Sequence, residues 1–175
     1  MNGVNSQVPI GLKLSMVTVA DAGAMWRLAH EAGRLDVNSS YSYLLWCREF
    51  AAASVVARHD SGDLAGFIVG FRRPSAPSEL FVWQVATAAD YRGRGVASAM
   101  LDRLIDHAAV SPVASGSRID ALEASVTADN RASIALFESF ARRHGGHLQR
   151  SPLFISAQFP DQHHTEELVR ISIRR

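Results

Sequence analysis

A short motif of glycines and arginines is the part of the sequence whose residue types indicate chemistry most directly. It consists of Arg92, Gly93, Arg94, Gly95, Val96 and Ala97. Glycines let the backbone turn tightly and gather several N–H groups at one point, and a helix that starts there adds about half a positive charge. Such a nest suits a pyrophosphate. No Gly-Lys-Ser/Thr of a Walker loop follows, and the dinucleotide glycine pattern is missing, so nucleotide hydrolysis and hydride transfer are disfavoured.

The elements around the motif must place it between a strand and a helix. Residues 80–87 predict a strand, and residues 96–109 predict a helix whose apolar face carries Met100, Leu101, Leu104 and Ile105. A further strand at 119–126 and a helix at 131–143 follow. The motif therefore lies where the backbone leaves a sheet and enters a helix, which is where anions bind in α/β proteins.

The rest of the chain alternates strand and helix patterns, which predicts an α/β fold with a mixed sheet. Strands are expected at 14–19, 53–59, 64–71, 148–155 and 168–173, and helices at 21–33 and 41–52. Residues 60–63 predict a hairpin turn, and Pro74 and Pro77 predict the bounds of a loop. Residues 156–167 show no clear element. We expect one domain over residues 1–175, with residues 1–11 flexible.

Composition excludes several classes of protein. The chain has 175 residues, 47% of them hydrophobic, and 18 basic residues balance 17 acidic ones, so its charge gives no long-range attraction for nucleic acid or a membrane. No apolar run approaches the roughly 20 residues that span a bilayer. Cys47 is the only cysteine, which excludes an internal disulfide and indicates the cytoplasm. His163 and His164 are adjacent and cannot readily face one ion, so we expect no metal and interpret their segment as a solvated loop or a substrate lid.

The motif resembles that of the GNAT acetyltransferases, whose pattern Arg-x-x-Gly-x-Gly/Ala is matched by Arg92, Gly95 and Ala97. The resemblance implies a GNAT fold in which the fourth and fifth strands splay apart to bind acetyl-CoA, without a metal. It implies that residues 92–97 hold the pyrophosphate, that Asn130 contacts the coenzyme, and that Val85, Ala86 and Thr87 contact the pantetheine arm. The sequence departs from the family pattern at Phe137. Many members have a tyrosine there, which protonates the departing thiolate of coenzyme A, so the general acid of this chain stays unassigned.

A second resemblance narrows the substrate. Residues 35–45, 81–85 and 163–171 are similar to the diaminobutyrate acetyltransferases of ectoine biosynthesis. The resemblance implies acetyl transfer to the γ-amino group of L-2,4-diaminobutyrate, a small-molecule substrate, and a homodimer. Alternatives are a GNAT enzyme for a polyamine, an aminoglycoside or a peptide N-terminus, and a non-catalytic acyl-CoA-binding module.

The residues in these segments suit a diamine with one carboxylate. Asp36 and Glu166 could bind ammonium groups. An ammonium over the face of Trp83 would gain about 0.5 to about 2 kcal/mol from cation–π attraction. Tyr41 and His163 are further candidates for substrate contact. Trp83 could instead be a core residue, Asp36 a turn or capping residue, and Tyr41 a packing residue.

The reaction itself needs a proton acceptor. An alkyl ammonium with a pKa of about 10 is only about 0.1% neutral at pH 7, and only the neutral amine attacks a thioester. Glu166 or Asp36 is the candidate base, directly or through a water, and a backbone N–H of the fourth strand is expected to stabilise the oxyanion. Cys47 lies in an apolar helical stretch, so we expect direct attack rather than an acetyl-enzyme.

Overall fold

The computed structural model describes residues 7–33, 37–110, 118–161 and 163–173, which form one seven-stranded sheet in the order β1-β2-β3-β4-β5-β7-β6. Its strands are β1 (Leu12–Met16), β2 (Val55–His59), β3 (Leu64–Arg73), β4 (Ala76–Thr87), β5 (Ala121–Thr127), β6 (His147–Phe154) and β7 (Glu166–Ser172). Neighbouring strands are antiparallel, except that β4 and β5 are parallel. The mixed sheet predicted from the sequence is confirmed, and most of its strand pairs are antiparallel.

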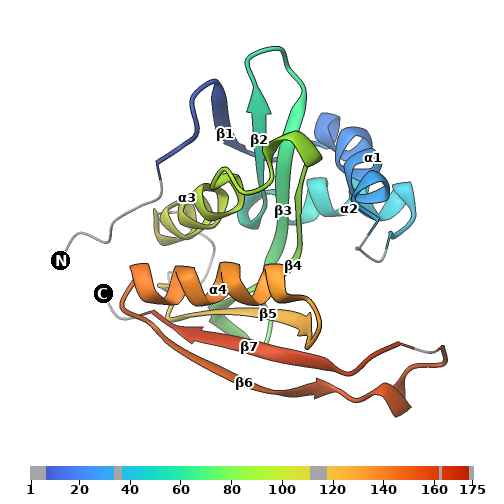
Figure 1. The fold of residues 1–175 in the computed structure, drawn as a ribbon, viewed down its shortest axis with the longest axis vertical. Helices are drawn as coiled ribbons and strands as arrows, with labels where there is room; N and C mark the ends of the chain where they lie inside the picture. The colour runs from blue at the N-terminus through green and yellow to red at the C-terminus, as the bar shows by residue number, and fades with distance from the viewer. Residues whose placement is uncertain (1–6, 34–36, 111–117, 162, 174–175) are drawn as a thin grey trace.

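Four α-helices in the described residues cover the two faces of the sheet (Figure 1). Helices α1 (Ala22–Ala32) and α2 (Ser40–Glu49) lie on one face, and α3 (Val96–Val110) and α4 (Arg131–Arg143) lie on the other. Gly33 ends α1 in a left-handed conformation, with a φ of 65°. Glycine adopts this conformation without strain. No helix in the described part of the chain has the length and apolar character needed to cross a membrane.

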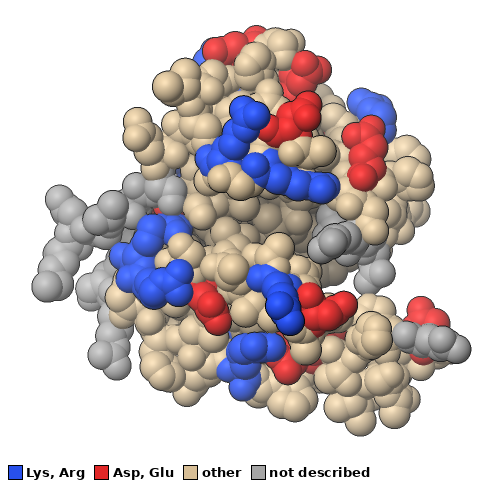
Figure 2. Space-filling model, viewed as in Figure 1, with Lys and Arg blue, Asp and Glu red and all other residues tan. Residues whose placement is uncertain are grey.

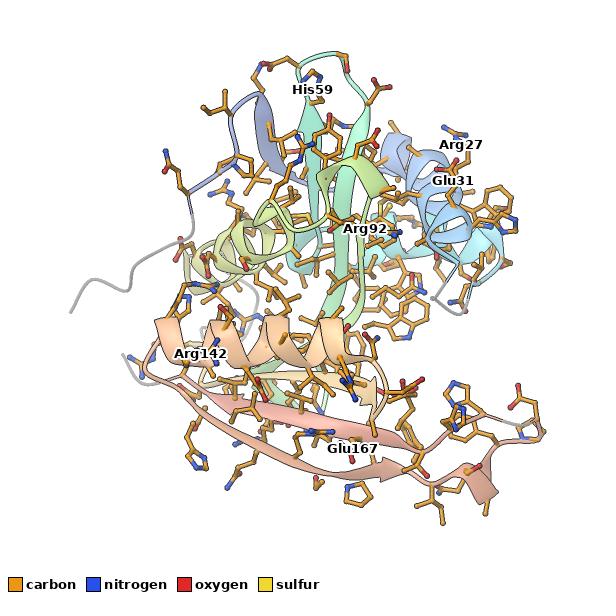
Figure 3. All side chains as sticks on the ribbon, in the orientation of Figure 1. Arg27, Glu31, His59, Arg92, Arg142 and Glu167 are labelled. Atoms are coloured by element: carbon orange, nitrogen blue, oxygen red, sulfur yellow. The ribbon has the colours of Figure 1, made fainter. Side chains whose placement is uncertain are left out.

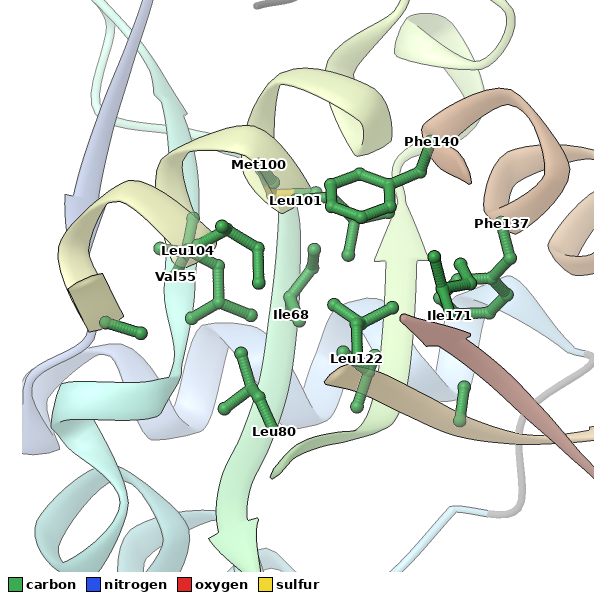
Figure 4. Close-up of a cluster of buried hydrophobic side chains, with 14 of the residues drawn as sticks. Val55, Ile68, Leu80, Met100, Leu101, Leu104, Leu122, Phe137, Phe140 and Ile171 are labelled. Carbon is green, nitrogen blue, oxygen red and sulfur yellow. The ribbon is translucent and has the colours of Figure 1, made fainter. Parts of the chain in front are cut away.

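Two apolar cores result from this arrangement. The larger one lies between the sheet and helices α3 and α4 (Figure 4), where Met100, Leu104 and Phe140 are fully buried. The smaller one lies between the sheet and helices α1 and α2, around Met25, Tyr43 and Phe67. Apolar residues recur three and four positions apart along α3, so one stripe of the helix faces the sheet.

The parallel pair β4 and β5 separates part-way along its length. The strands pair from Glu79–Ala121 to Val82–Ala124, whereas β4 continues to Thr87 and β5 to Thr127. Beyond Val82 the described part of β4 therefore has β3 as a partner on one edge and none on the other. Unpaired N–H and C=O groups on such an edge are ready to bind another extended chain. The splayed strands implied by the GNAT resemblance are present.

A β-bulge at Trp83 interrupts the alternation of β4 side chains between the two cores. Val69 pairs with Gln84 and Gly70 pairs with Val82, so Trp83 is the extra residue of β4. Val82, before the bulge, belongs to the larger core, and Val85, after it, packs against the same core. The bulge therefore shifts the alternation by one residue and turns Gln84 toward α2, where Tyr43 bonds it.

Several predicted element bounds are wrong, among them the first strand, which is Leu12–Met16 rather than residues 14–19. Residues 74–77 are not a loop, because β4 starts at Ala76, which pairs with Arg73 across a turn at Pro74 and Ser75. Pro77 is tolerated because the pairing shifts there and its missing N–H is not needed in the β3–β4 ladder. The last strand starts at Glu166 rather than at Leu168.

Candidate functional site

A cleft of about 720 Å³ opens where β4 leaves β5. Nine of the ten residues predicted to contact a coenzyme line it; Arg94 is the exception. The nine are Val85, Ala86, Thr87, Arg92, Gly93, Gly95, Val96, Ala97 and Asn130. Figure 3 shows Arg92 at the centre of the molecule, in the loop that joins β4 to α3.

The glycine loop has the geometry of an anion nest. Gly93 and Gly95 have φ angles of 72° and 81°. Both angles lie in the left-handed region that glycine adopts without strain. Gly95 O accepts a hydrogen bond from Ala99 N (3.0 Å), which fixes the first turn of α3. The first N–H groups of the helix have no partner within it, so they are available to an anion in the cleft.

The two arginine side chains of the loop contact residues that directly precede the loop. Arg92 Nε donates to Thr87 O (3.3 Å), and the Arg94 guanidinium lies 5.9 Å from the centre of the Tyr91 ring. Both arginines are exposed, and several basic groups are visible around the hollow in Figure 2. The loop therefore places positive charge beside the backbone nest.

A second helix starts at the same cleft. Asn130 caps α4, and its Oδ1 accepts from Ser133 N (3.1 Å). Because the carbonyl oxygen of this side chain makes the cap, the amide NH2 group is the part that can donate to a ligand. Ser133, Leu136 and Ser139 continue the wall of the cleft along α4.

Phe137 does not belong to that wall. Its ring is 2% exposed and lies in the core under α4, whereas Leu136 and Ser139 on either side of it line the cleft. The position that carries a tyrosine in many GNAT enzymes is thus part of the hydrophobic core in this chain.

Trp83 lies in an aromatic cluster between β4 and α2. Its ring stacks on Trp46, with centroids 4.3 Å apart and planes at 20°, and Trp46 also contacts Phe50 and Phe71. Trp83 is only partly buried. One face of the indole is therefore supported by Trp46, and the site of Trp83 is built jointly by α2 and the bulge of β4.

A buried polar pair fixes α2 at the same place. Tyr43 Oη donates to Gln84 Oε1 (2.9 Å), and both side chains are buried, at 1% and 5% exposure. Burial raises the pKa of the Tyr43 hydroxyl because the charged form would lose its hydration. The group therefore acts as a neutral hydrogen-bond donor across a wide pH range.

Glu166 lies at the start of β7, where Ser125 bonds its carboxylate and His163 lies nearby. Ser125 Oγ, on β5, donates to Glu166 Oε2, and His163 Nε2 lies 3.6 Å from Glu166 Oε1. Glu166 pairs with Thr127, the last residue of β5, in the part of β5 that has left β4. The carboxylate thus belongs to the splayed region of the sheet.

Glu167 has a different environment because strand residues alternate between faces. It accepts from Arg150 Nε of β6 (2.8 Å), and Figure 3 shows it between β6 and β7. Adjacent carboxylates in the sequence therefore have separate partners in the structure.

The ring of His163 is fixed by three neighbours. It stacks on Phe159 (4.2 Å between centroids), its Nδ1 lies 2.7 Å from His164 O, and its Nε2 faces Glu166. A carbonyl oxygen can only accept, so Nδ1 carries the hydrogen of that bond. His163 and Glu166, both predicted as site residues, are thus neighbours.

The remaining predicted site residues are less closely tied to this arrangement. Asp36 lies outside the described residues. Tyr41 is in the first turn of α2 and is 69% exposed. No group of three or more His, Cys, Asp or Glu in the described part of the chain could hold a metal ion.

Cys47 is not placed for nucleophilic chemistry. It is 2% exposed in the core under α2, with its Sγ 3.5 Å from Met25 Sδ, and burial raises the pKa of its thiol to about 11. Since the thiolate is the nucleophile, a thiol with that pKa is inert at neutral pH.

Residues 23–141 match the acetyltransferase (GNAT) family. The chain belongs to that family. It is 48% identical to L-2,4-diaminobutyric acid acetyltransferase of Streptomyces coelicolor over 158 residues, which cover 90% of both chains. It is 39% identical to the protein of the same name from Oceanobacillus iheyensis, over 87% of this chain and 82% of the relative. Within the GNAT family, the chain groups with these relatives.

Solved structures agree with this grouping. Diaminobutyrate acetyltransferase from Paenibacillus lautus, in complex with L-2,4-diaminobutyric acid and coenzyme A, matches with a TM-score of 0.83 and 33% identity, covering 93% of this chain and 95% of that one. Ard1 from Thermoplasma volcanium matches with a TM-score of 0.71 at 17% identity, which shows the shared fold alone. The predicted GNAT fold is confirmed.

Sequence analysis missed Trp46, Gln84 and Ser125. Trp46 had a detectable signal, since an aromatic residue follows Tyr43 at helical spacing and both would face the sheet. Gln84, beside Trp83, was visible as a polar residue within an apolar strand. Ser125 had no signal, because only the pairing of β5 with β7 brings it to Glu166.

Proposed function

We propose that this chain transfers the acetyl group of acetyl-CoA to the γ-amino group of L-2,4-diaminobutyrate. The observation that carries the proposal is the combination of the glycine nest with a carboxylate in the splayed region of the sheet, in a chain that is 48% identical to a diaminobutyric acid acetyltransferase. The product is the Nγ-acetyl amino acid that an ectoine synthase would cyclise, so the reaction is a biosynthetic step, and we propose the cytoplasm as its location.

Acetyl-CoA is the acetyl donor, and we assign it to the cleft between β4 and α4, where the glycine loop supplies backbone N–H groups and positive charge. We assign the pyrophosphate to the nest at residues 92–97, with Asn130 as a further donor. The unpaired edge of β4 at Val85, Ala86 and Thr87 would pair with the amide groups of the pantetheine arm, as a neighbouring strand would. This brings the thioester toward Trp83 and the splay.

The substrate pocket is assigned to the other side of the splay. Diaminobutyrate carries two ammonium groups and one carboxylate, so its pocket needs an excess of acidic groups. Glu166 supplies one, and the outer face of Trp83, supported by Trp46, supplies a cation–π surface. Asp36, Tyr41 and His163 are proposed to complete the pocket.

In the proposed reaction, Glu166 accepts a proton from the substrate ammonium, directly or through a water, with Asp36 as the alternative base. The freed lone pair of nitrogen attacks the thioester carbon and forms the C–N bond, and a backbone N–H of β4 stabilises the oxyanion. The C–S bond then breaks, and the second proton of the amine goes to the departing sulfur. Cys47 is inert, which supports direct attack without an acetyl-enzyme.

We also propose that the protein is a homodimer. Large apolar side chains are exposed on α2 and at the end of β6, and a second copy would remove them from water. They are Leu44, Leu45, Phe154 and Ile155. Light scattering on a sizing column would give twice the chain mass, and Leu44→Glu with Leu45→Glu would convert the dimer to a monomer. A monomeric wild type would overturn the proposal.

The activity is tested by acetyl-CoA consumption with diaminobutyrate, ornithine, lysine, spermidine and a peptide, with the acetylated nitrogen identified by NMR. We expect turnover of diaminobutyrate at its γ-amino group. Turnover of spermidine or the peptide instead would keep the acetyltransferase and remove diaminobutyrate as substrate, and coenzyme binding without turnover would indicate a non-catalytic module.

The site is tested by a matched pair of variants. Glu166→Gln removes the proposed base, whereas Glu167→Gln makes the same change one residue further along β7, in a carboxylate paired with Arg150. We expect kcat to fall at least about 100-fold in Glu166→Gln, as for loss of general base catalysis, and to stay near the wild-type value in Glu167→Gln. Equal activity of the two variants would exclude Glu166 as the base.

A further inference from the structure

Ser125 occupies a defined place in the splay. Val82–Ala124 is the last parallel pair, so Ser125 is the first residue of β5 without a β4 partner, just as Trp83 is the first residue of β4 without a β5 partner. Ala124 and Val126 face the core under α4, so Ser125 faces the opposite side of the sheet. There it shares a face with Glu166, which is two positions from its own partner Leu168 on β7.

The hydrogen bond from Ser125 distinguishes the two oxygens of Glu166. A carboxylate has no hydrogen to donate, so the Ser125 hydroxyl is the donor and Oε2 the acceptor. Oε1 lies on the side of His163 Nε2, 3.6 Å away. The final torsion of a glutamate side chain is broad, and a bond to one oxygen restricts it. Ser125 therefore determines which oxygen is presented toward His163.

We infer that Ser125 is a positioning residue for Glu166, an inference that rests on the proposed function. By holding Oε2, the hydroxyl keeps Oε1 directed at the substrate ammonium and at His163. The proton then leaves nitrogen for Oε1, while the Ser125 hydrogen stays on its own oxygen. Ser125 takes part in no bond change. Its contribution is to keep the acceptor in one orientation, on which the rate of a proton transfer depends strongly.

The first test compares three serine variants that all keep the strand. Ser125→Ala should lower kcat with diaminobutyrate about tenfold, the size expected for one hydrogen bond to a charged group, and leave the Kd of coenzyme A unchanged. Ser125→Thr keeps the hydroxyl and should restore kcat to within about twofold of wild type. Ser172→Ala is the matched control, because Ser172 lies on β7 and its hydroxyl bonds a backbone oxygen, that of His147. It should behave as wild type.

A double-mutant cycle separates positioning from a general loss of structure. If Ser125 acts through Glu166, then adding Ser125→Ala to Glu166→Ala should cost no further activity, with residual rates measured by mass spectrometry. A tenfold loss in both backgrounds would overturn the inference, as would a Ser125→Ala variant with wild-type kcat. Absence of wild-type turnover of diaminobutyrate would overturn the proposed function and the inference together, so the two failures are distinct.

Discussion

The indole rings of Trp46 and Trp83 stack 4.3 Å apart, with an angle of 20° between their planes. This contact joins the middle of α2 to the bulge of β4, next to the Tyr43–Gln84 hydrogen bond that joins the same two elements. The orientation of Trp83, and hence any ammonium site on its outer face, depends on a helix distant from it in sequence.

Loss of this stack should weaken binding of the amine selectively. Trp46→Leu removes an aromatic contact worth about 0.5 to about 1.5 kcal/mol, so we expect KM for diaminobutyrate to rise about 2- to 10-fold while the Kd of coenzyme A is unchanged. Trp26→Leu is the control, because Trp26 stacks on His30 of α1 instead. Steady-state kinetics of both variants measure the effect, and an equal rise in KM for the two would contradict the prediction.

The left-handed conformation of Gly95 should matter for coenzyme binding. In Gly95→Ala a Cβ is forced to a φ of 81°. This costs about 1 kcal/mol or more and disturbs the nest. We expect the Kd of coenzyme A, measured by calorimetry, to rise about tenfold or more. Gly62→Ala puts the same strain in the β2–β3 turn, at a φ of 95°. It should lower the melting temperature without changing that Kd.

Cys47 should be unreactive, and ionisation of its thiol should make the free energy of unfolding depend on pH. Its thiol pKa is raised from 9.0 to about 11 by burial, so the folded protein holds this proton more tightly than the unfolded chain. The stabilisation is complete below about pH 9 and is lost as the pH rises to about 11. We expect folded protein at pH 8 to resist iodoacetamide. We expect Cys47→Ala to keep kcat and to lose less of its free energy of unfolding than wild type between pH 9 and 11. Rapid labelling at pH 8 would contradict this.

A buried ion pair between α3 and α4 should contribute strongly to stability. Asp102 accepts from Arg143 (3.1 Å) and His144 (2.8 Å), and its side chain is 3% exposed. Asp102→Ala leaves the largely buried Arg143 guanidinium without this acceptor. The free energy of unfolding, measured in urea, should therefore fall by about 3 kcal/mol. Asp60→Ala removes an exposed pair with Lys13. It should leave the free energy of unfolding almost unchanged, because water and salt screen an exposed pair. Similar losses of unfolding free energy in the two variants would contradict the prediction.

Local sequence patterns were sufficient to predict most of the strands and helices and the coenzyme loop. Helix α4 has the predicted bounds, and the turn at residues 60–63 joins antiparallel strands, because periodicity and turn residues act over a few neighbours. The glycines at 93 and 95 have positive φ angles as the nest requires. The prediction of a loop at Pro77 was wrong because the pairing of β3 with β4 is irregular there, and an irregular position accepts a proline within a strand.

The neighbours of each site residue, in contrast, depend on how the strands pair and how the helices pack on them. The bulge at Trp83 depends on the pairing of β4 with β3, and the contact of Ser125 with Glu166 depends on β7 lying between β5 and β6. Glu166 and Glu167 are equivalent in the sequence, but strand alternation gives one of them Ser125 and His163 as neighbours and the other Arg150. Ser125 and Glu166 are 41 positions apart, and no local periodicity encodes such a contact. It exists because burying both faces of the sheet fixes the order and register of its strands.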